Sequence, residues 1–374
     1  MKKCVIVPDS FKGTISAVEI CNIVKEKVLM YYPDCDVISI PVADGGEGTV
    51  DSFLHAMDGE SVEIIVSGPY LEKLTCNYAR FGSTAVVEMA QAAGLPLVTG
   101  KENPAITTTY GVGEMIHHAI DNGCNEIIIG LGGSSTNDGG TGLAAALGVK
   151  FFDNENKEFL PTGNTLSKIS AIDVTQARSL LKDCKITAMC DIDNPMYGKN
   201  GAAYIFGPQK GADEEMVELL DQNLMALSER IIKDLGIDVS QLPGAGAAGA
   251  CGAGIAAFLQ GELKAGIQTV LDLVEFEELI NGADLVITGE GKIDGQSLRG
   301  KVVIGVSERA KRKEVPVVAI VGDIADDAVG AYEMGVTSIF SINRLAIPFE
   351  KARLRSKQDL AATVNDIIRF HKFC

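Results

Sequence analysis

Apolar runs and amphipathic segments alternate at the start of the chain. Residues 4–7 form a continuous apolar run, which is typical of a strand buried on both faces. Ser16 and Glu19 follow at the spacing of a capping box, and an amphipathic pattern continues to about Tyr32. Residues 37–42 are the next strand candidate. A strand, a helix and a second strand in this order favour a parallel sheet.

The last third of the chain has the same alternation. Strand-like runs at residues 284–288, 315–321 and 338–342 are separated by helical patterns. Because parallel strands are joined through crossover helices, we expect both ends of the chain to build one doubly wound parallel sheet. The sequence therefore predicts an α/β fold in which the middle of the chain is an inserted domain.

The middle of the chain has a different pattern. Residues 62–66, 75–81 and 85–89 are strand candidates with short connections, which is typical of antiparallel or mixed pairing. Further strands are expected at residues 126–129 and 185–190, each followed by a polar loop. The inserted domain is therefore predicted to be α/β with a mixed sheet.

Composition removes several classes of protein. The net charge of −17 argues against binding to nucleic acid, which needs clustered basic residues. No apolar run reaches about 18 residues, so no membrane span is expected, and no signal peptide pattern precedes the first strand. The nine cysteines include no CxxC pair, which favours a reducing, cytoplasmic compartment over a disulfide or zinc framework. The sequence leaves the oligomeric state open.

Polar loops follow the predicted strands, and ligands of doubly wound sheets bind beyond the carboxyl ends of strands. In the first loop, Lys12 precedes a helix N-terminus, where an anion is favoured. It is either a phosphate or carboxylate clamp or an exposed lysine in a turn. The second loop joins Asp44 and Glu47 to three glycines that allow close approach of a ligand. The two carboxylates suit hydroxyl groups or Mg²⁺, and the alternative is an acidic turn that caps the next helix.

The third loop, residues 130–140, is rich in glycine, serine, threonine and asparagine. Its amides are suited to form a nest for phosphate groups. It is not a Walker A loop, and Ser135 stands where the third glycine of GxGxxG would be. The alternative is a simple glycine turn, but the cluster of polar side chains favours a binding site.

The fourth loop contains Asp191 and Asp193 directly after a predicted strand. Residues two apart at a strand end point the same way, so the two carboxylates are expected to lie together. Such a pair can bind Mg²⁺, or one of them can accept a proton from a substrate hydroxyl. Turn formation before Pro195 is the alternative.

The fifth loop runs from Thr288 to Ser297 and continues to Lys301. It carries two acids and three bases, and phosphoryl transfer needs both cations for the moving charge and a carboxylate for metal or base. A solvated charged turn is the alternative, but glycines separate nearly every charge.

Taken together, these loops resemble those of bacterial glycerate kinases of the first type. The motifs that carry the resemblance are Asp9 to Gly13, Pro41 to Thr49, Gly130 to Gly142, Cys190 to Pro195 and Thr288 to Ser297. They occur in the expected order and cover essentially the whole chain. The resemblance implies Mg²⁺-dependent transfer of the γ-phosphoryl group of ATP to D-glycerate, with 2-phosphoglycerate as the product.

The resemblance also implies two domains. One is a split, flavodoxin-like α/β domain, for which we take residues 1–66 and 268–374. The other is an inserted α/β domain with a mixed sheet, residues 67–267, and the active site is expected in the cleft between them.

Residue type and loop position then suggest roles for the candidates. Lys12 or Arg299 is expected to hold the carboxylate of glycerate, and Asp44 and Glu47 its hydroxyls. Either Lys292 or Lys301 is expected to stabilise charge on the γ-phosphoryl group. The candidates for nucleotide binding are Gly132, Gly133, Ser134, Ser135 and Lys301.

The base and the metal ligands are assigned less narrowly. Either Asp191 or Asp294 is expected to act as the base, with the other nearer Mg²⁺, and Asp193 is a further candidate metal ligand. Because the transition state is loose, positioning and electrostatics should matter more than a strong base.

Three alternative functions compete with this prediction. A glycerate 3-kinase would give 3-phosphoglycerate from the same substrates. An NAD-dependent dehydrogenase of hydroxy acids would share the fold and the substrate class, but the missing GxGxxG argues against it. A non-catalytic binding protein of sugar-acid metabolism would not need so many carboxylates beside glycine loops.

Overall fold

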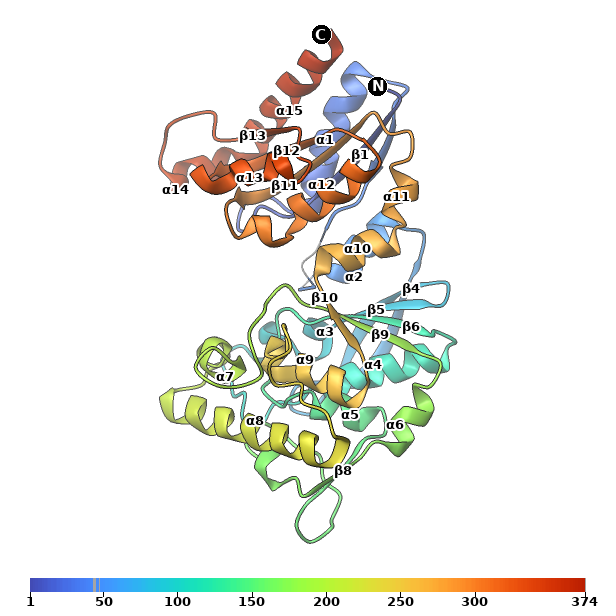
Figure 1. The fold of residues 1–374 in the computed structure, drawn as a ribbon, viewed down its shortest axis with the longest axis vertical. Coiled ribbons are helices and arrows are strands. Elements are labelled where there is room, and N and C mark those ends of the chain that lie inside the picture. Colours follow the sequence, from blue (N-terminus) through green and yellow to red (C-terminus); the bar gives the residue numbers. More distant parts are fainter. Residues whose placement is uncertain (43–44, 47, 374) are drawn as a thin grey trace. The chain divides into compact units, whose positions relative to one another are not determined.

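The chain folds into two compact units, each with its own sheet (Figure 1). The structure is a computed structural model in which residues 1–42, 45–46 and 48–373 are described. The first unit comprises Met1–Ala43, Asp51–Met57 and Ile267–Cys374, and the second comprises Asp44–Val50 and Asp58–Gly266.

The first unit is built on five parallel strands in the order β13-β12-β11-β1-β2. Counted along the chain, this order is 2-1-3-4-5, as in flavodoxin-like sheets. The strands are β1 (Lys3–Pro8), β2 (Asp36–Ser39), β11 (Leu285–Ile293), β12 (Val317–Ile324) and β13 (Ser338–Ser341). Since β1 pairs with β11, the prediction that both ends of the chain form one doubly wound sheet is confirmed.

Helices cover both faces of this sheet. Val318 and Ile320 pack into one apolar cluster with residues of α1 (Ala17–Tyr31) and α15 (Ser356–Phe373). Their neighbours Ala319 and Val321 point the other way, into a cluster with α12 (Val302–Arg312) and α13 (Gly330–Glu333). Strand side chains alternate between the faces of a sheet, which is why β12 is apolar at every position of its buried part.

The predicted capping box is present at the start of α1. Ser16 accepts a hydrogen bond from the N–H of Glu19, and the Glu19 carboxylate accepts one from the N–H of Ser16. The shorter helices with most or all of their residues in this unit are α2 (Thr49–Ala56), α10 (Gly266–Leu273), α11 (Phe276–Leu279) and α14 (Phe349–Ala352).

The fifth predicted loop is partly strand. β11 continues to Ile293, and its residues Glu290 and Lys292 pair with Val321 and Asp323 of β12. Glycine allows the close approach of these strands, since a Cβ on Gly289 would lie 2.1 Å from the carbonyl oxygen of Ile320. The glycines that predicted a loop are therefore partly a packing requirement of the sheet.

The second unit has a six-stranded mixed sheet in the order β10-β9-β6-β5-β4-β3. The pairs from β10 to β5 are parallel, whereas β5 with β4 and β4 with β3 are antiparallel, which confirms the predicted mixed sheet. The strands are β3 (Glu60–Ser67), β4 (Lys73–Phe81), β5 (Thr84–Glu88), β6 (Glu126–Gly130), β9 (Lys185–Met189) and β10 (Glu262–Lys264).

Helices and one small hairpin complete the second unit. The hairpin strands β7 (Lys150–Phe152) and β8 (Ala171–Asp173) pair antiparallel and are joined by residues 153–170. The helices are α3 (Met89–Ala93), α4 (Tyr110–Asp121), α5 (Thr141–Ala146), α6 (Thr175–Leu180), α7 (Ala202–Phe206), α8 (Glu214–Leu235) and α9 (Ala247–Phe258).

The division of the chain differs from the predicted boundary at residues 66 and 67. β3 pairs with β4 along its whole length, from Glu60 to Ser67, so these residues belong to the second sheet. The second boundary falls after Gly266, one residue before the predicted position. In the residues that the structure describes, every helix is too short or too polar to cross a bilayer.

Candidate functional site

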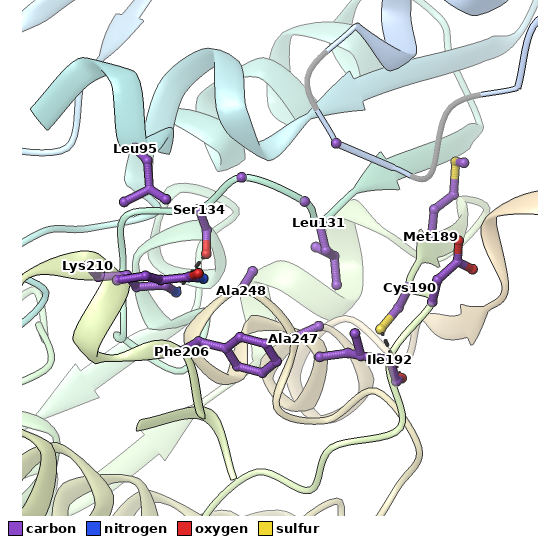
Figure 2. A pocket seen from close by; sticks show the side chains of 15 residues that line it. Leu95, Leu131, Ser134, Met189, Cys190, Ile192, Phe206, Lys210, Ala247 and Ala248 are labelled. Carbon is purple, nitrogen blue, oxygen red and sulfur yellow. Dashed lines mark hydrogen bonds between the residues drawn. The ribbon is translucent and has the colours of Figure 1, made fainter. Parts of the chain in front are cut away.

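A cavity of about 260 Å³ lies in the second unit, beyond the carboxyl ends of β6 and β9 (Figure 2). This volume is just below the range of about 300–1,000 Å³ that is usual for small-molecule sites. The cavity is lined by Gly46, Leu95, Leu131, Gly132, Gly133, Ser134, Met189, Cys190, Asp191, Ile192, Phe206, Gln209, Lys210, Ala247 and Ala248.

The glycine-rich loop after β6 forms one side of the cavity. A Cβ on Gly132 would lie 2.5 Å from the Cα of Gly46, and one on Gly130 would lie 2.5 Å from the oxygen of Gly45. The N–H of Gly132 donates to Gly45 at 2.8 Å. These glycines therefore bring two backbone segments of the unit together, in addition to any approach to a ligand.

Some backbone N–H groups of this loop donate hydrogen bonds within the described part of the chain, and others do not. The N–H and the hydroxyl of Ser135 both donate to the oxygen of Ala93, at 2.8 and 2.9 Å, and the N–H of Gly132 is bonded as described above. By contrast, the N–H groups of Gly133 and Ser134 have no acceptor within the described part of the chain. Of the predicted loop residues, these two present unused donors beside the cavity.

Residues 248–250 have a strained backbone and contact the glycine-rich loop. Ala248, Gly249 and Ala250 have φ values of 53°, 65° and 66° at the start of α9. The left-handed region is costly for alanine, and such strain concentrates at functional sites. A Cβ on Gly249 would lie 2.0 Å from the oxygen of Thr136, and Gly249 accepts the N–H of Gly139 at 3.0 Å. The segment therefore fixes the glycine-rich loop, while Ala248 lines the cavity.

Lys210 is a cavity residue that the sequence analysis missed. It ends a short 3₁₀ turn after α7, is 3% exposed, and donates to the hydroxyl of Ser134 at 2.8 Å and the oxygen of Thr136 at 2.7 Å. Burial lowers the pKa of Lys210 to about 7, and Asp138 and Cys251 act in the opposite direction. The only signal in the sequence was a single lysine between glycines in an apolar segment.

Asp191 and Asp193 follow β9, but not as the sequence analysis expected. β9 ends at Met189, so both residues lie beyond the strand and its alternation does not orient them. Asp191 lines the cavity, and its Oδ1 accepts the N–H of Gly266 at 2.7 Å. Asp193 is exposed and is not among the lining residues.

The candidates of the first unit gather at the carboxyl end of β11. Lys292 Nζ lies 4.0 Å from Asp294 Oδ2. The Oδ1 of Asp294 accepts the N–H groups of Gln296 at 3.0 Å and Ser297 at 3.3 Å, so this carboxylate also closes a turn. Lys12 and Lys301 are exposed, the latter directly before α12.

Glu290 is a second residue that the sequence analysis did not single out. It is 5% exposed, and its Oε1 has no hydrogen-bond partner among the described residues. Burial raises the pKa of Glu290 to about 7, against the opposing effects of Ser297 and Lys301. β11 is the strand next to β1, at the point where the strand order of the sheet reverses, and this is where flavodoxin-like sheets bind ligands.

Three predicted substrate-binding residues lie wholly or partly outside the described residues. Asp44 and Glu47 lie outside the described residues, and so does the side chain of Arg299. In the part of the chain that is described, no group of three or more His, Cys, Asp or Glu side chains could hold a metal ion.

A flavodoxin-like unit and a second α/β unit that holds a cavity with unused amides define a two-domain protein with a small-molecule site. Comparison with known proteins is more specific. The chain belongs to the glycerate kinase family, whose sequence model matches residues 4–372.

Individual relatives agree with the family. A glycerate kinase from Bacillus cereus is 45% identical over 368 residues, which are 98% of this chain and 97% of the relative. The glycerate 2-kinase of Escherichia coli K12 is 46% identical over 343 residues, which are 91% of this chain and 90% of the relative. A crystal structure assigned to glycerate kinase 2 of Salmonella typhimurium LT2 superposes with a TM-score of 0.86 at 39% identity, covering 99% of this chain and 98% of the other.

Proposed function

We propose that this protein is a glycerate kinase that transfers the γ-phosphoryl group of ATP to D-glycerate and releases 2-phosphoglycerate. Membership of the family supports ATP as the donor and glycerate as the acceptor. The name of the Escherichia coli relative, glycerate 2-kinase, supports the 2-position of the product. The observation that carries the proposal is the cavity, where the unused amides of Gly133 and Ser134 lie beside an apolar wall.

The cavity suits a nucleotide because it has two kinds of surface. Consecutive amides form a nest that accepts phosphate oxygens, and Gly133 and Ser134 supply them. Figure 2 shows Phe206, Ala247 and Ile192 along one side of the cavity and Leu131 on the other. Apolar surfaces of this kind accept the faces of an aromatic base.

The other residues predicted to bind the nucleotide are Gly132, Ser135 and Lys301. Gly132 and Ser135 act through the backbone contacts that shape the loop. The role of Lys301 stays a prediction from residue type and loop position. That both domains share one active site stays an expectation from the resemblance.

For the chemical step, we assign Asp191 or Asp294 as the base. Each is a carboxylate that follows the carboxyl end of a strand and accepts a backbone N–H. Lys292, which is adjacent to Asp294, is assigned to the developing charge on the γ-phosphoryl group. Lys12 or Arg299 would hold the carboxylate of glycerate, and Asp44 and Glu47 its hydroxyls.

Mg²⁺ fits the donor chemistry of this chain. It is usually held by one or two carboxylates, together with waters and substrate phosphates, so the lack of a cluster of three ligands in the described residues does not conflict with it. Asp191, Asp193 and Asp294 are the residues that would hold it. When bound with ATP, the ion neutralises charge on the phosphate oxygens.

The proposal is tested by incubating the purified protein with D-glycerate, ATP and Mg²⁺ and following ADP release and the phosphorus NMR spectrum. Glycerate-dependent ADP with a 2-phosphoglycerate signal is expected. The 3-isomer would retain the kinase and correct the position of transfer. No glycerate-dependent ADP would refute the substrate assignment. Oxidation of NADH by hydroxypyruvate would favour the dehydrogenase instead.

A further inference from the structure

The strongest unassigned feature of the cavity is the charge of Lys210. A lysine that is 3% exposed has lost nearly all of its hydration. Buried ammonium groups are normally paired with a carboxylate, because leaving the charge uncompensated is costly. In the described part of the chain, Lys210 makes no ion pair, and its two hydrogen bonds go to the uncharged groups of Ser134 and Thr136.

The hydrogen bonds of Lys210 are also incomplete. An ammonium group has three N–H donors and no acceptor. One donor is used by the Ser134 hydroxyl and one by the Thr136 carbonyl. The third is left for a ligand, and Lys210 lines the cavity beside Ser134 (Figure 2). Gly133 is also a lining residue.

Two groups act electrostatically on Lys210, the Asp138 carboxylate and the Cys251 thiol, but neither is hydrogen-bonded to it. The Asp138 carboxylate accepts the N–H and the hydroxyl of Thr109, both at 2.8 Å, and the N–H groups of Gly140 at 3.1 Å and Gly142 at 3.2 Å. It is therefore committed to holding the start of α5. Burial keeps the pKa of the Cys251 thiol well above its usual value, so this group is neutral. Asp138 offsets part of the charge, yet burial still lowers the pKa of Lys210 to about 7, so an anionic ligand at the third donor would stabilise the charged form.

A nucleotide phosphate fits this position better than a small acid. The donors of Gly133, Ser134 and Lys210 gather beside the same loop, which suits several oxygens of one anionic group. The apolar side chains of Leu131, Ile192 and Phe206 continue the cavity, and glycerate has no apolar part to place against them. A nucleotide has both parts.

We propose that Lys210 binds a phosphate oxygen of the nucleotide and supplies the positive charge of this phosphate site. The proposal rests on the proposed function, since it takes ATP as the ligand of the cavity. It adds a ligand-binding residue from a part of the chain that contributes none of the five motifs discussed above.

Two effects on nucleotide binding follow. Lys210→Met keeps the length of the side chain but removes its charge, and charged hydrogen bonds to phosphate are among the strong ones. The affinity for ADP with Mg²⁺ is therefore expected to fall at least tenfold. In addition, the pKa of Lys210 is about 7 in the unliganded protein, so most of this lysine is neutral at pH 8.0. A bound phosphate raises that pKa, and binding should take up close to one proton.

Calorimetry of ADP binding at pH 8.0 measures both effects. Titrations in two buffers with different heats of ionisation give the number of protons exchanged, and the phosphate groups of ADP are already ionised at this pH. Lys210→Arg keeps a permanent charge, so it is expected to bind ADP without proton uptake. The matched control is Lys233→Met, which removes an exposed lysine of α8 and should leave affinity and proton uptake as in the native protein.

The outcomes separate this inference from the proposed function. Weaker binding in Lys210→Met, together with proton uptake that only the native protein and the control show, would support the assignment. Native affinity in Lys210→Met, or native binding without proton uptake, would overturn it and leave the kinase function standing. An effect on KM for glycerate without an effect on ADP affinity would also overturn it. Absence of ADP binding in the native protein would overturn both. Because proton uptake is measured on the native protein, the test does not depend on whether a variant folds.

Discussion

Burial disfavours the charged form of two ionisable side chains. They are Lys210 in the second unit, whose charged form is positive, and Glu290 in the first, whose charged form is negative. Both are at most 5% exposed, and burial moves the pKa of each to about 7. Perturbed groups of this kind concentrate at functional sites. Neither residue stood out in the sequence, because the residue type does not reveal its burial.

Glu290 gives a prediction about stability and pH. Its pKa is about 7 in the folded protein and near 4.5 when exposed. The folded protein therefore loses stability as pH rises from about 4.5 to 7, while the buried carboxyl ionises. Glu290→Gln removes this loss, so it should raise the free energy of unfolding at pH 8 by on the order of 1–3 kcal/mol and leave it nearly unchanged at pH 4.5.

Thermal and urea unfolding at the two pH values measure this difference. Glu308→Gln is the matched control, because Glu308 is exposed on α12 of the same unit. A Glu290→Gln variant whose stability changes equally at pH 4.5 and pH 8 would show that burial of the charge is not the cause.

The two candidate bases give a prediction about turnover. Asp191→Asn removes a charge but keeps an oxygen that can accept the N–H of Gly266, and Asp294→Asn likewise keeps an acceptor for its turn. A base or metal ligand should lose at least about tenfold in kcat. Asp183→Asn, at an exposed site before β9, is the control. If both variants stay within about threefold of the native rate, a difference under roughly 1 kcal/mol, the assignment is wrong.

At the scale of elements, strands were predicted better than loops. Apolar runs identify buried strands directly, and the predicted strands at residues 126–129 and 185–190 differ from β6 and β9 by a single residue. The loop after β11 was predicted to begin near residue 288, but the strand continues to Ile293. The reason is that glycines mark turns in a sequence and also mark close contacts between strands. Only pairing with β12 distinguishes the two uses.

The glycine-rich loop after β6 gives the prediction at this scale. In Gly132→Ala, the new Cβ would lie 2.5 Å from a backbone atom of Gly46, and backbone cannot move aside as a flexible side chain can. The variant should lose about 1–3 kcal/mol of stability and should bind ADP more weakly, because the loop is displaced.

Urea unfolding and ADP titration of this variant check the prediction. Gly291→Ala is the control, since its Cβ would meet nothing nearer than 3.7 Å and its stability should be close to native. Native stability in Gly132→Ala would show that the contact with Gly46 is not needed for the loop.

At the scale of the whole molecule, the two units are assembled from the chain in different ways. The second sheet is formed entirely within residues 58–266, from β3 to β10. The first sheet needs both ends of the chain, because β1 lies between β2 and β11. The units should therefore differ in their ability to fold as fragments.

A fragment of residues 58–266 is expected to fold by itself, with reduced stability because it lacks Gly45 and its hydrogen bond to Gly132. A fragment of residues 267–374 is expected to stay unfolded or to aggregate, since loss of β1 leaves an edge of β11 and part of the core uncovered. Circular dichroism and the dispersion of NMR signals measure both, with the full chain as the control. Cooperative unfolding of the 267–374 fragment would contradict the prediction.

The sequence by itself determined the α/β class, the split of one sheet between the chain ends, the mixed sheet of the insertion and the motifs of the family. These follow from periodicity and order along the chain, which are local properties. The tertiary structure alone decided that the N–H of Gly132 donates to the oxygen of Gly45 and that the N–H of Ser135 donates to the oxygen of Ala93. It also decided that Lys210 reaches Ser134 across 76 positions of sequence. Burial and hydrogen-bond partners depend on contacts between distant segments, and no local pattern encodes them.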